Sequence, residues 1–353
     1  MAGFGLVCLY SALRGSLVVP VNILNKQIVL LFGAVAVGAV VSQCRERWLH
    51  ALAFPALIAG ALGLIAVLIP GIGVSVNGAR RWIDLGISHF QVSELAKALF
   101  LVGFAYYLAR YRRHRRDWLL GFLVPMAIIA VYCGLIIKEP DFGTAFLFAA
   151  VGGTMLFLWG ARVVWLVGAT VPGLAWFFYM IWEDPVRWKR IVSFLDVEGN
   201  KTDGAYQLYQ GILAFGAGGA TGVGIGNGRQ QLAYLPEAHT DFILPVIGEE
   251  LGMIATLSIV SLYGLLFLSI AWIARTAGNV FWYLLAAGGG CFVVYQALFN
   301  VCVVTGLVPT KGISLPFISY GGANLLASFL ILGLIVCARK HSLNSPILGA
   351  REI

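Results

Sequence analysis

One carboxylate stands at a position that suits general-base chemistry. In the segment PEAHTDF (Pro236–Phe242), Asp241 lies where a polar stretch runs into a long apolar run, close to His239. A carboxylate at such a boundary is partly removed from water, which makes it a better proton acceptor. Thr240 or Asp241 would also suit a helix N-cap, so the spacing leaves both interpretations open.

Four further charged residues fall in or at the ends of apolar runs. Glu94 and Lys97 are three residues apart and would share one face of a helix. Charges inside a bilayer are costly and usually face a cavity or each other. The pair is therefore either mutually neutralised and structural, or the lining of a substrate path or proton relay. Glu249 and Glu250 lie about two turns beyond Asp241, where one of them could orient other groups in a cavity.

Basic residues that could bind a pyrophosphate gather on the predicted outer side, where most of the acidic residues also lie. They are Arg80, Arg81, Arg187, Lys189, Arg190, Arg229 and Lys311. Guanidinium and ammonium groups are the natural donors to phosphate oxygens. A contact with lipid at the membrane interface is an equally good interpretation for any single one of them.

Several familiar chemistries lack their parts in this sequence. It has no GxxxxGK[ST] phosphate loop, no HExxH, no GxSxG and no His/Cys cluster with metal spacing. The glycine-rich run GVGIGNG at 222–228 follows no βαβ strand and is interpreted as a turn. Since ATP is absent outside the cell, a reaction there needs an activated substrate delivered in the membrane. Polyprenyl-pyrophosphate sugars fit that description.

The composition identifies the kind of scaffold that must hold these groups. Of the 353 residues, 60% are hydrophobic and 11% are charged, which is too apolar for a soluble enzyme, a disordered chain or a nucleic-acid-binding module. The six cysteines are scattered without a CxxC pair, so neither a disulfide framework nor a zinc site is expected. The basic run at 110–117 is interpreted as a membrane-topology determinant touching anionic lipid, and no nucleic-acid partner is expected.

Ten apolar runs are candidates for membrane-spanning helices, although the first is too short to cross alone. They cover roughly 1–13, 27–43, 49–69, 93–109, 118–137, 142–159, 162–182, 243–274, 280–304 and 322–338. Lys and Arg concentrate in the segments that are inside when the N-terminus is inside. We therefore expect an all-α integral membrane protein, with residues 1–353 as one polytopic domain. Both termini are expected in the cytoplasm, with one large extracytoplasmic loop at 183–240 between helices seven and eight.

Five segments of the sequence resemble the signature segments of the SEDS family (shape, elongation, division and sporulation), in the family's order and over most of the chain. They are NGARRWIDLG (77–86), QVSELAKALF (91–100), EPDFGTA (139–145), YLPEAHTDFILPVIGEELG (234–252) and GLVPTKGISLPFISYGGAN (306–324). The strings NGARRW, AHTDF and PTKG favour the cell-division branch over the elongation branch.

The resemblance implies ten transmembrane helices and a peptidoglycan glycosyltransferase that polymerises lipid II outside the bacterial cytoplasmic (inner) membrane. Lipid II would be both donor and acceptor, and undecaprenyl pyrophosphate would leave. The implied partners are a cognate class B penicillin-binding protein, which crosslinks the strands, and other divisome membrane proteins. An elongation polymerase and a lipid II flippase remain alternatives, and the flippase would need alternating access.

The resemblance also assigns residues. The family's essential acid falls on Asp241, its ELAK pair on Glu94 and Lys97, and its PD pair on Pro140 and Asp141. The expected substrate- or pyrophosphate-binding residues are Arg80, Arg81, Lys311, Glu94, Lys97, Asp141, His239, Glu249, Glu250 and Ser319. No cofactor is expected with certainty, and a divalent cation (Mg²⁺ or Mn²⁺) is an alternative to Arg80, Arg81 or Lys311 for meeting the leaving-group charge.

The sequence departs from the family pattern at two places. Glu139 stands before Pro140 where members commonly have glutamine, which adds a negative charge near a supposed pyrophosphate site. Leu244 and Pro245 follow the HTDF segment where members commonly have other residues. Proline is tolerated in a first helical turn, but it can shift where the helix begins.

Overall fold

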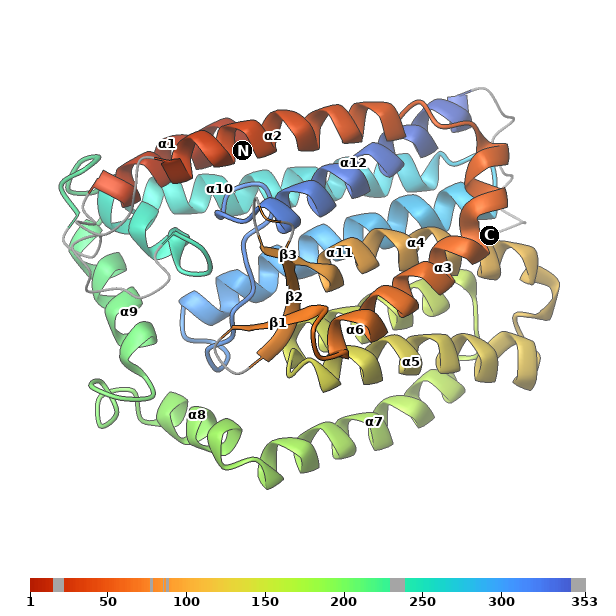
Figure 1. Ribbon diagram of the computed structural model, residues 1–353, viewed down its shortest axis with the longest axis horizontal. Helices are drawn as coiled ribbons and strands as arrows, with labels where there is room; N and C mark the ends of the chain where they lie inside the picture. The colour runs from red at the N-terminus through yellow and green to blue at the C-terminus, as the bar shows by residue number, and fades with distance from the viewer. Residues whose placement is uncertain (15–21, 77–78, 85, 87–88, 229–238, 344–353) are drawn as a thin grey trace. The chain divides into compact units, whose positions relative to one another are not determined.

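The computed structural model describes residues 1–14, 22–76, 79–84, 86, 89–228 and 239–343, and within them the chain is largely helical (Figure 1). The helices are α1 (Ala2–Arg14), α2 (Asn22–Val41), α3 (Glu46–Leu68), α4 (Val92–Arg110), α5 (Val124–Lys138), α6 (Phe142–Trp159), α7 (Val163–Glu183), α8 (Pro185–Leu195), α9 (Tyr206–Gly218), α10 (Ile243–Arg275), α11 (Val280–Val304) and α12 (Gly322–Leu343). A π-helical turn at Leu119–Leu123 leads into α5.

Nine of the described helices are long and apolar enough to cross a membrane, namely α2, α3, α4, the run Leu119–Lys138 that contains α5, α6, α7, α10, α11 and α12. Lipid cannot hydrogen-bond to the backbone, so helices that satisfy their own amides are the form such runs must take. The predicted all-α membrane class is confirmed. The first predicted span, 1–13, corresponds to a shorter apolar helix, Ala2–Ser11.

The predicted loop at 183–240 contains two helices of its own in its described part, α8 and α9. The chain divides into two compact units built from separate stretches. The first unit comprises residues 1–29, 168–265 and 296–321, and the second comprises residues 30–167, 266–295 and 322–353.

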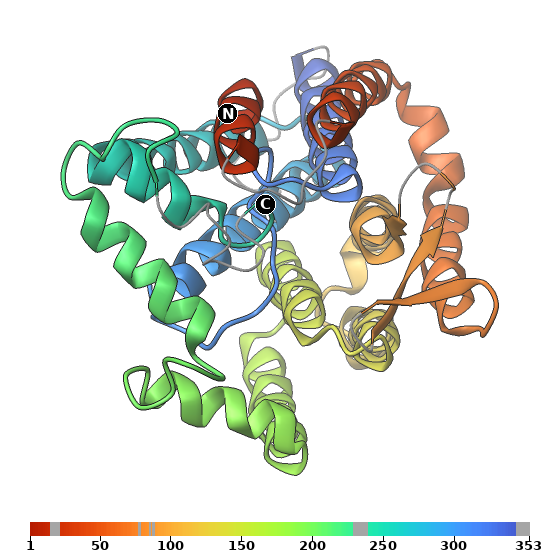
Figure 2. The same ribbon diagram turned by 60° about the vertical axis from the view of Figure 1, so that its left-hand side comes forward.

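The second unit contains a small sheet that the sequence reading missed. Strands β1 (Gly73–Val76), β2 (Ala79–Asp84) and β3 (His89–Gln91) form an antiparallel sheet in the order β1-β2-β3 between α3 and α4. Figures 1 and 2 both show the strands against the end of α3. The sheet places Arg80 and Arg81 on one strand, directly before the helix that carries Glu94 and Lys97.

An aromatic core holds α4, α5, α6 and the first part of α11 together in the second unit. The rings of Phe100, Tyr132, Phe148 and Phe292 are in contact, with centroid distances of 5.0 to 5.3 Å along the chain of contacts. Buried aromatic pairs of this kind stabilise packing beyond the area they bury. The starts of α4 and α6, which carry the polar residues of this unit, are therefore anchored to a rigid core.

The first unit is shaped by a break in α10. Gly252 has φ 78° and ψ −175°, which is not helical, and it separates an amino-terminal segment from the longer remainder of the helix. The loop after α9 fills the break. The amides of Val223 and Gly224 donate to the carbonyls of Glu249 and Glu250 at 3.0 and 2.9 Å. The glycine-rich run at 222–228 is thus a turn, as expected, and part of it seals a helix break.

Candidate active site

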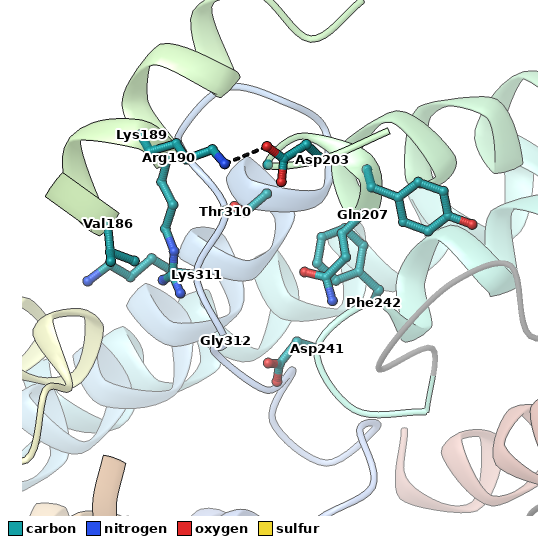
Figure 3. A pocket seen from close by; sticks show the side chains of 12 residues that line it. Val186, Lys189, Arg190, Asp203, Gln207, Asp241, Phe242, Thr310, Lys311 and Gly312 are labelled. Carbon is teal, nitrogen blue, oxygen red and sulfur yellow. Dashed lines mark ion pairs between the residues drawn. The ribbon is translucent and has the colours of Figure 1, made fainter. Parts of the chain in front are cut away.

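Asp241 lines a cavity of about 450 Å³ in the first unit (Figure 3). The walls come from α8, the turn before α9, the start of α9, the turn before α10 and a loop after α11. The lining residues are Val186, Lys189, Arg190, Asp203, Gly204, Tyr206, Gln207, Asp241, Phe242, Thr310, Lys311 and Gly312. A concave site with a few convergent polar groups is the usual form of a ligand site.

The Asp241 carboxylate is held close to the loop that carries Lys311. The Ser314 hydroxyl donates to Asp241 Oδ1 at 3.3 Å. A Cβ atom added to Gly312 would lie 2.6 Å from Asp241 Oδ2, closer than real side chains allow. Gly312 is therefore what lets this loop approach the carboxylate.

Three cationic side chains line the cavity, namely Lys189, Arg190 and Lys311. Lys189 Nζ lies 2.5 Å from Asp203 Oδ2 in a mostly exposed ion pair. Arg190 makes no ion pair with any described residue, and Figure 3 shows it reaching from α8 toward the loop of Lys311 and Gly312. Arg187 is not part of the cavity lining, and its guanidinium pairs with Asp184 at 2.9 Å. Arg190 is thus a cavity cation without an ion pair among the described residues, and Lys311 lines the same cavity.

A second polar cluster lies in the second unit. Arg81 Nη1 is 3.5 Å from Asp141 Oδ2, and Gln91 Nε2 donates to the same oxygen at 3.2 Å. Asp141 also caps α6, accepting from the Thr144 amide at 3.1 Å. Asp141 is therefore well hydrogen-bonded, as expected of a structural cap.

Glu139 adds a buried acid to this cluster. Its side chain is 0% exposed, and neither carboxyl oxygen has a hydrogen-bond partner among the described residues. Burial, reinforced by the nearby Asp141 carboxylate and partly opposed by Arg81, raises the pKa of Glu139 to about 8. At neutral pH this group is mostly protonated, so the extra negative charge expected from the sequence is largely absent.

The comparisons with known proteins cover nearly the whole chain. A family model described as cell cycle protein, FtsW/RodA/SpoVE, matches residues 1–344. The chain belongs to this family. It is similar to the probable peptidoglycan glycosyltransferase FtsW of Trichlorobacter lovleyi, with 40% identity over 99% of this chain and 93% of the relative. It is 38% identical to the FtsW of the same description from Thioalkalivibrio sulfidiphilus, over 98% of this chain and 88% of the relative.

Two solved structures share the family fold. A chain from a peptidoglycan synthase complex, studied for the coordination of polymerization and crosslinking, superposes with a TM-score of 0.81 at 26% identity. That alignment covers 97% of this chain and 95% of the other. The rod shape determining protein RodA of Thermus thermophilus superposes with a TM-score of 0.70 at 26% identity, over 96% and 93% of the two chains.

The remaining residues expected from the family resemblance have identifiable positions. Glu94 and Lys97 form a buried ion pair at 2.7 Å on α4. Arg80 Nη1 lies 3.5 Å from the carbonyl of Leu68. These contacts fit the structural interpretation of the Glu94–Lys97 pair, and the proton-relay role stays a prediction.

In the first unit, the other expected residues lie outside the cavity lining. Glu249 and Glu250 are buried in α10, and Glu250 Oε1 accepts a hydrogen bond from Ser11 at 2.8 Å. The Ser319 hydroxyl accepts from the amide of Leu315 at 2.8 Å and so braces its own loop. The His239 ring lies against Tyr320. Arg229 falls outside the described residues.

Several residues around Asp241 were missed by sequence reasoning. Gln207, Asp203 and Gly312 line the cavity, and Asn300 and Ser314 contact Asp241 directly. Asn300 carried a usable signal, because a polar residue within an apolar span usually faces the protein interior. Asp203, Gly312 and Ser314 lie in loops, where spacing carries no such information, and Gln207 lies at the start of α9.

The described residues contain no group of three or more His, Cys, Asp or Glu side chains able to hold a metal ion. The cavity does offer the carboxylates of Asp241 and Asp203. Mg²⁺ is often bound by one or two carboxylates together with substrate phosphates. A divalent cation that meets the leaving-group charge stays a prediction.

Proposed function

We propose that this chain is a peptidoglycan glycosyltransferase that polymerises lipid II into β-1,4-linked glycan strands during cell division. Family membership and the relatives described as probable peptidoglycan glycosyltransferase FtsW support this activity. The single observation that carries the chemistry is a cavity in which the Asp241 carboxylate stands among cations. The polymer is made at the outer face of the bacterial inner membrane, with both chain termini in the cytoplasm.

In the proposed reaction Asp241 is the general base. Its carboxylate accepts the proton of the 4-hydroxyl of the acceptor's N-acetylglucosamine. The oxygen forms a bond to C1 of the donor's N-acetylmuramic acid while the bond from C1 to the pyrophosphate oxygen breaks. The leaving undecaprenyl pyrophosphate keeps the electron pair, and the anomeric centre inverts. A positioned base typically contributes about 10²- to 10⁴-fold in rate.

The reaction also requires stabilisation of the leaving group, which the cations of the cavity supply. Charge builds on the pyrophosphate as it leaves, and preorganised cations stabilise that charge most strongly in a site with little water. Lys311 lies two residues before Ile313 in the loop beside Asp241, and Arg190 enters from α8. We assign the leaving group to these two residues, in preference to Arg80 and Arg81 of the second unit.

The base assignment is tested with Asp241→Asn in purified protein given lipid II, with glycan strands resolved on gels. We expect at least a 100-fold loss of polymer with a normal melting temperature. Glu198→Gln is the matched control, since Glu198 is exposed and does not line the cavity, and it should leave the polymer yield unchanged. Normal glycan strands from Asp241→Asn would refute the assignment.

The cation assignment is tested by comparing Arg190→Met with Arg187→Met. Both remove one guanidinium from α8, but only Arg190 lines the cavity. We expect Arg190→Met to reduce kcat/KM for lipid II by about tenfold or more, while Arg187→Met stays within about twofold. Equal effects of the two variants would contradict the assignment.

One observation favours a transporter as the second candidate. A helix broken within the membrane, as α10 is at Gly252, is typical of transporters, where exposed carbonyls at the break bind ions or substrate. Here the amides of Val223 and Gly224 occupy those carbonyls, which weighs against a transport site. Liposomes containing the protein and lipid II distinguish the two, because a flippase moves lipid II without making polymer.

The proposed partner is a crosslinking enzyme, a class B penicillin-binding protein. The similar chain of a synthase complex that coordinates polymerization and crosslinking supports this choice. Polymer yield measured with and without the cognate penicillin-binding protein tests it, and co-purification of the two gives an independent readout.

A further inference from the structure

Two amide side chains stand one turn apart in the last part of α11. Gln296 and Asn300 are both buried, at 4% and 1% exposure. Residues four apart lie on one face of a helix, so both amides project from the same side. The surrounding sequence, VVYQALFNVCVV, is otherwise almost entirely apolar.

Asn300 joins two separate segments of the cavity wall. Its Nδ2 donates to the carbonyl of Asp241 at 2.8 Å and to the carbonyl of Ile313 at 2.7 Å. Both amide hydrogens are therefore used, one on the turn that carries Asp241 and one on the loop that follows Lys311.

Gln296 extends the same contact by one residue. Its Nε2 donates to the carbonyl of Ser314 at 2.8 Å, and the Ser314 hydroxyl reaches back to Asp241 Oδ1 at 3.3 Å. The two amides of α11 thus join the turn of Asp241 to two consecutive residues of the later loop, Ile313 and Ser314.

The carbonyl oxygen of the Asn300 side chain indicates why this position carries an amide and not an apolar side chain. Asn300 Oδ1 is buried and has no hydrogen-bond partner among the described residues. A buried unpaired acceptor is destabilising, and an apolar side chain of similar size would avoid that cost. The side chain is therefore used for its two donors.

The far end of the loop has its own supports. The Ser319 hydroxyl accepts from the Leu315 amide, Tyr263 donates to the Pro316 carbonyl, and the Tyr320 amide donates to the His239 carbonyl at 2.9 Å. Loss of the α11 amides would therefore loosen the 311–314 end of the loop and leave the rest in place.

We propose that Asn300 and Gln296 are positioning residues that fix the Asp241 carboxylate relative to Lys311 and Ser314 for the glycosyl transfer. This inference rests on the proposed function, because it gives Asp241 the role of base. Neither amide needs to touch substrate. They act by holding the Asp241 turn and the loop of Lys311 at the distance at which the carboxylate serves the acceptor hydroxyl while Lys311 serves the leaving pyrophosphate.

The test compares Asn300→Leu with wild type in lipid II polymerisation across pH. Leucine matches the size of asparagine but donates no hydrogen bond. We expect kcat to fall about 10- to 100-fold while KM changes by less than about threefold. The acid limb of the pH–rate profile should move to higher pH, because the carboxylate loses its fixed relation to the Ser314 hydroxyl and to Lys311.

The pH profile separates positioning from simple loss of folded protein. A smaller active fraction lowers kcat but leaves the profile where it was. Asn300→Gln keeps both amide hydrogens on a longer arm, so it should retain at least about fivefold more activity than Asn300→Leu. Ser11→Ala is the matched control: it also removes a buried hydrogen bond of the first unit, and it should leave kcat and the profile unchanged.

Three results would overturn the proposal: a wild-type kcat for Asn300→Leu, an unmoved profile, or equal activity of Asn300→Gln and Asn300→Leu. If Asn300→Leu does not fold, Gln296→Leu takes its place. It removes the hydrogen bond to the Ser314 carbonyl, and it should give the same profile shift with a smaller loss of kcat. The wild-type measurement tests the proposed function separately. A wild-type protein that makes no glycan refutes the function itself, whereas an active wild type with unaffected variants refutes only this inference.

Discussion

The buried acid Glu139 predicts an unusual dependence of stability on pH. Burial raises its pKa in the folded protein from an ordinary value of 4.5 to about 8. As the pH rises, the unfolded chain therefore loses this proton before the folded chain does. The stability associated with Glu139 is complete below about pH 4.5 and is lost progressively up to about pH 8.

The size of the effect follows from the shift. Each pH unit between the two pKa values removes about 1.4 kcal/mol of folding free energy. Between pH 5.5 and 7.5 wild type should therefore lose roughly 2–3 kcal/mol through this group. Glutamine fills the same space and cannot ionise, so Glu139→Gln should escape that loss.

The assay is thermal unfolding of both proteins in detergent, followed by tryptophan fluorescence at pH 5.5, 6.5 and 7.5. We expect the melting temperature of Glu139→Gln to gain on wild type by on the order of 5 °C across this range. Glu198→Gln is the matched control, because Glu198 is exposed and its substitution should give parallel curves. A difference between Glu139→Gln and wild type that stays constant with pH would refute the reasoning.

Two glycines give further predictions. Gly252→Ala should destabilise the protein by about 1–3 kcal/mol, because φ is 78° and the new Cβ would lie 2.4 Å from the Ala220 carbonyl oxygen; a lower melting temperature is the readout. Gly264→Ala, on an open helical face of α10, should leave the melting temperature unchanged or raise it. Gly312→Ala should reduce polymerisation by about tenfold or more with little change in melting temperature, because its Cβ would displace the Asp241 carboxylate. Activity within about twofold of wild type would contradict the close approach of this loop to Asp241.

Local features of the sequence were sufficient to predict the membrane helices. The apolar runs that predict spans correspond to described helices. In a bilayer, a segment with apolar side chains has few other ways to satisfy the hydrogen bonds of its polar backbone. The three-stranded sheet was missed since its strands are only three to six residues long. The Asn77–Gly78 pair, a common hairpin signal, was the available indication.

The sequence also singled out Asp241, Lys311 and Arg190 by residue type. It gave no reason to prefer Lys311 and Arg190 over the other basic candidates for binding pyrophosphate. The tertiary structure divided that set. Arg81 pairs with Asp141, Arg187 pairs with Asp184, and Arg190 and Lys311 line the cavity of Asp241.

What the amino-acid sequence determined by itself is therefore the class of fold, the helical runs and the residue types able to do the chemistry. The assembly around Asp241 was decided only by the tertiary structure. Asn300 is 59 residues from Asp241 and Ser314 is 73 residues away, and no local periodicity reports such contacts. Hydropathy acts along the chain, whereas a reactive site depends on distances between segments that the chain brings together only when it folds.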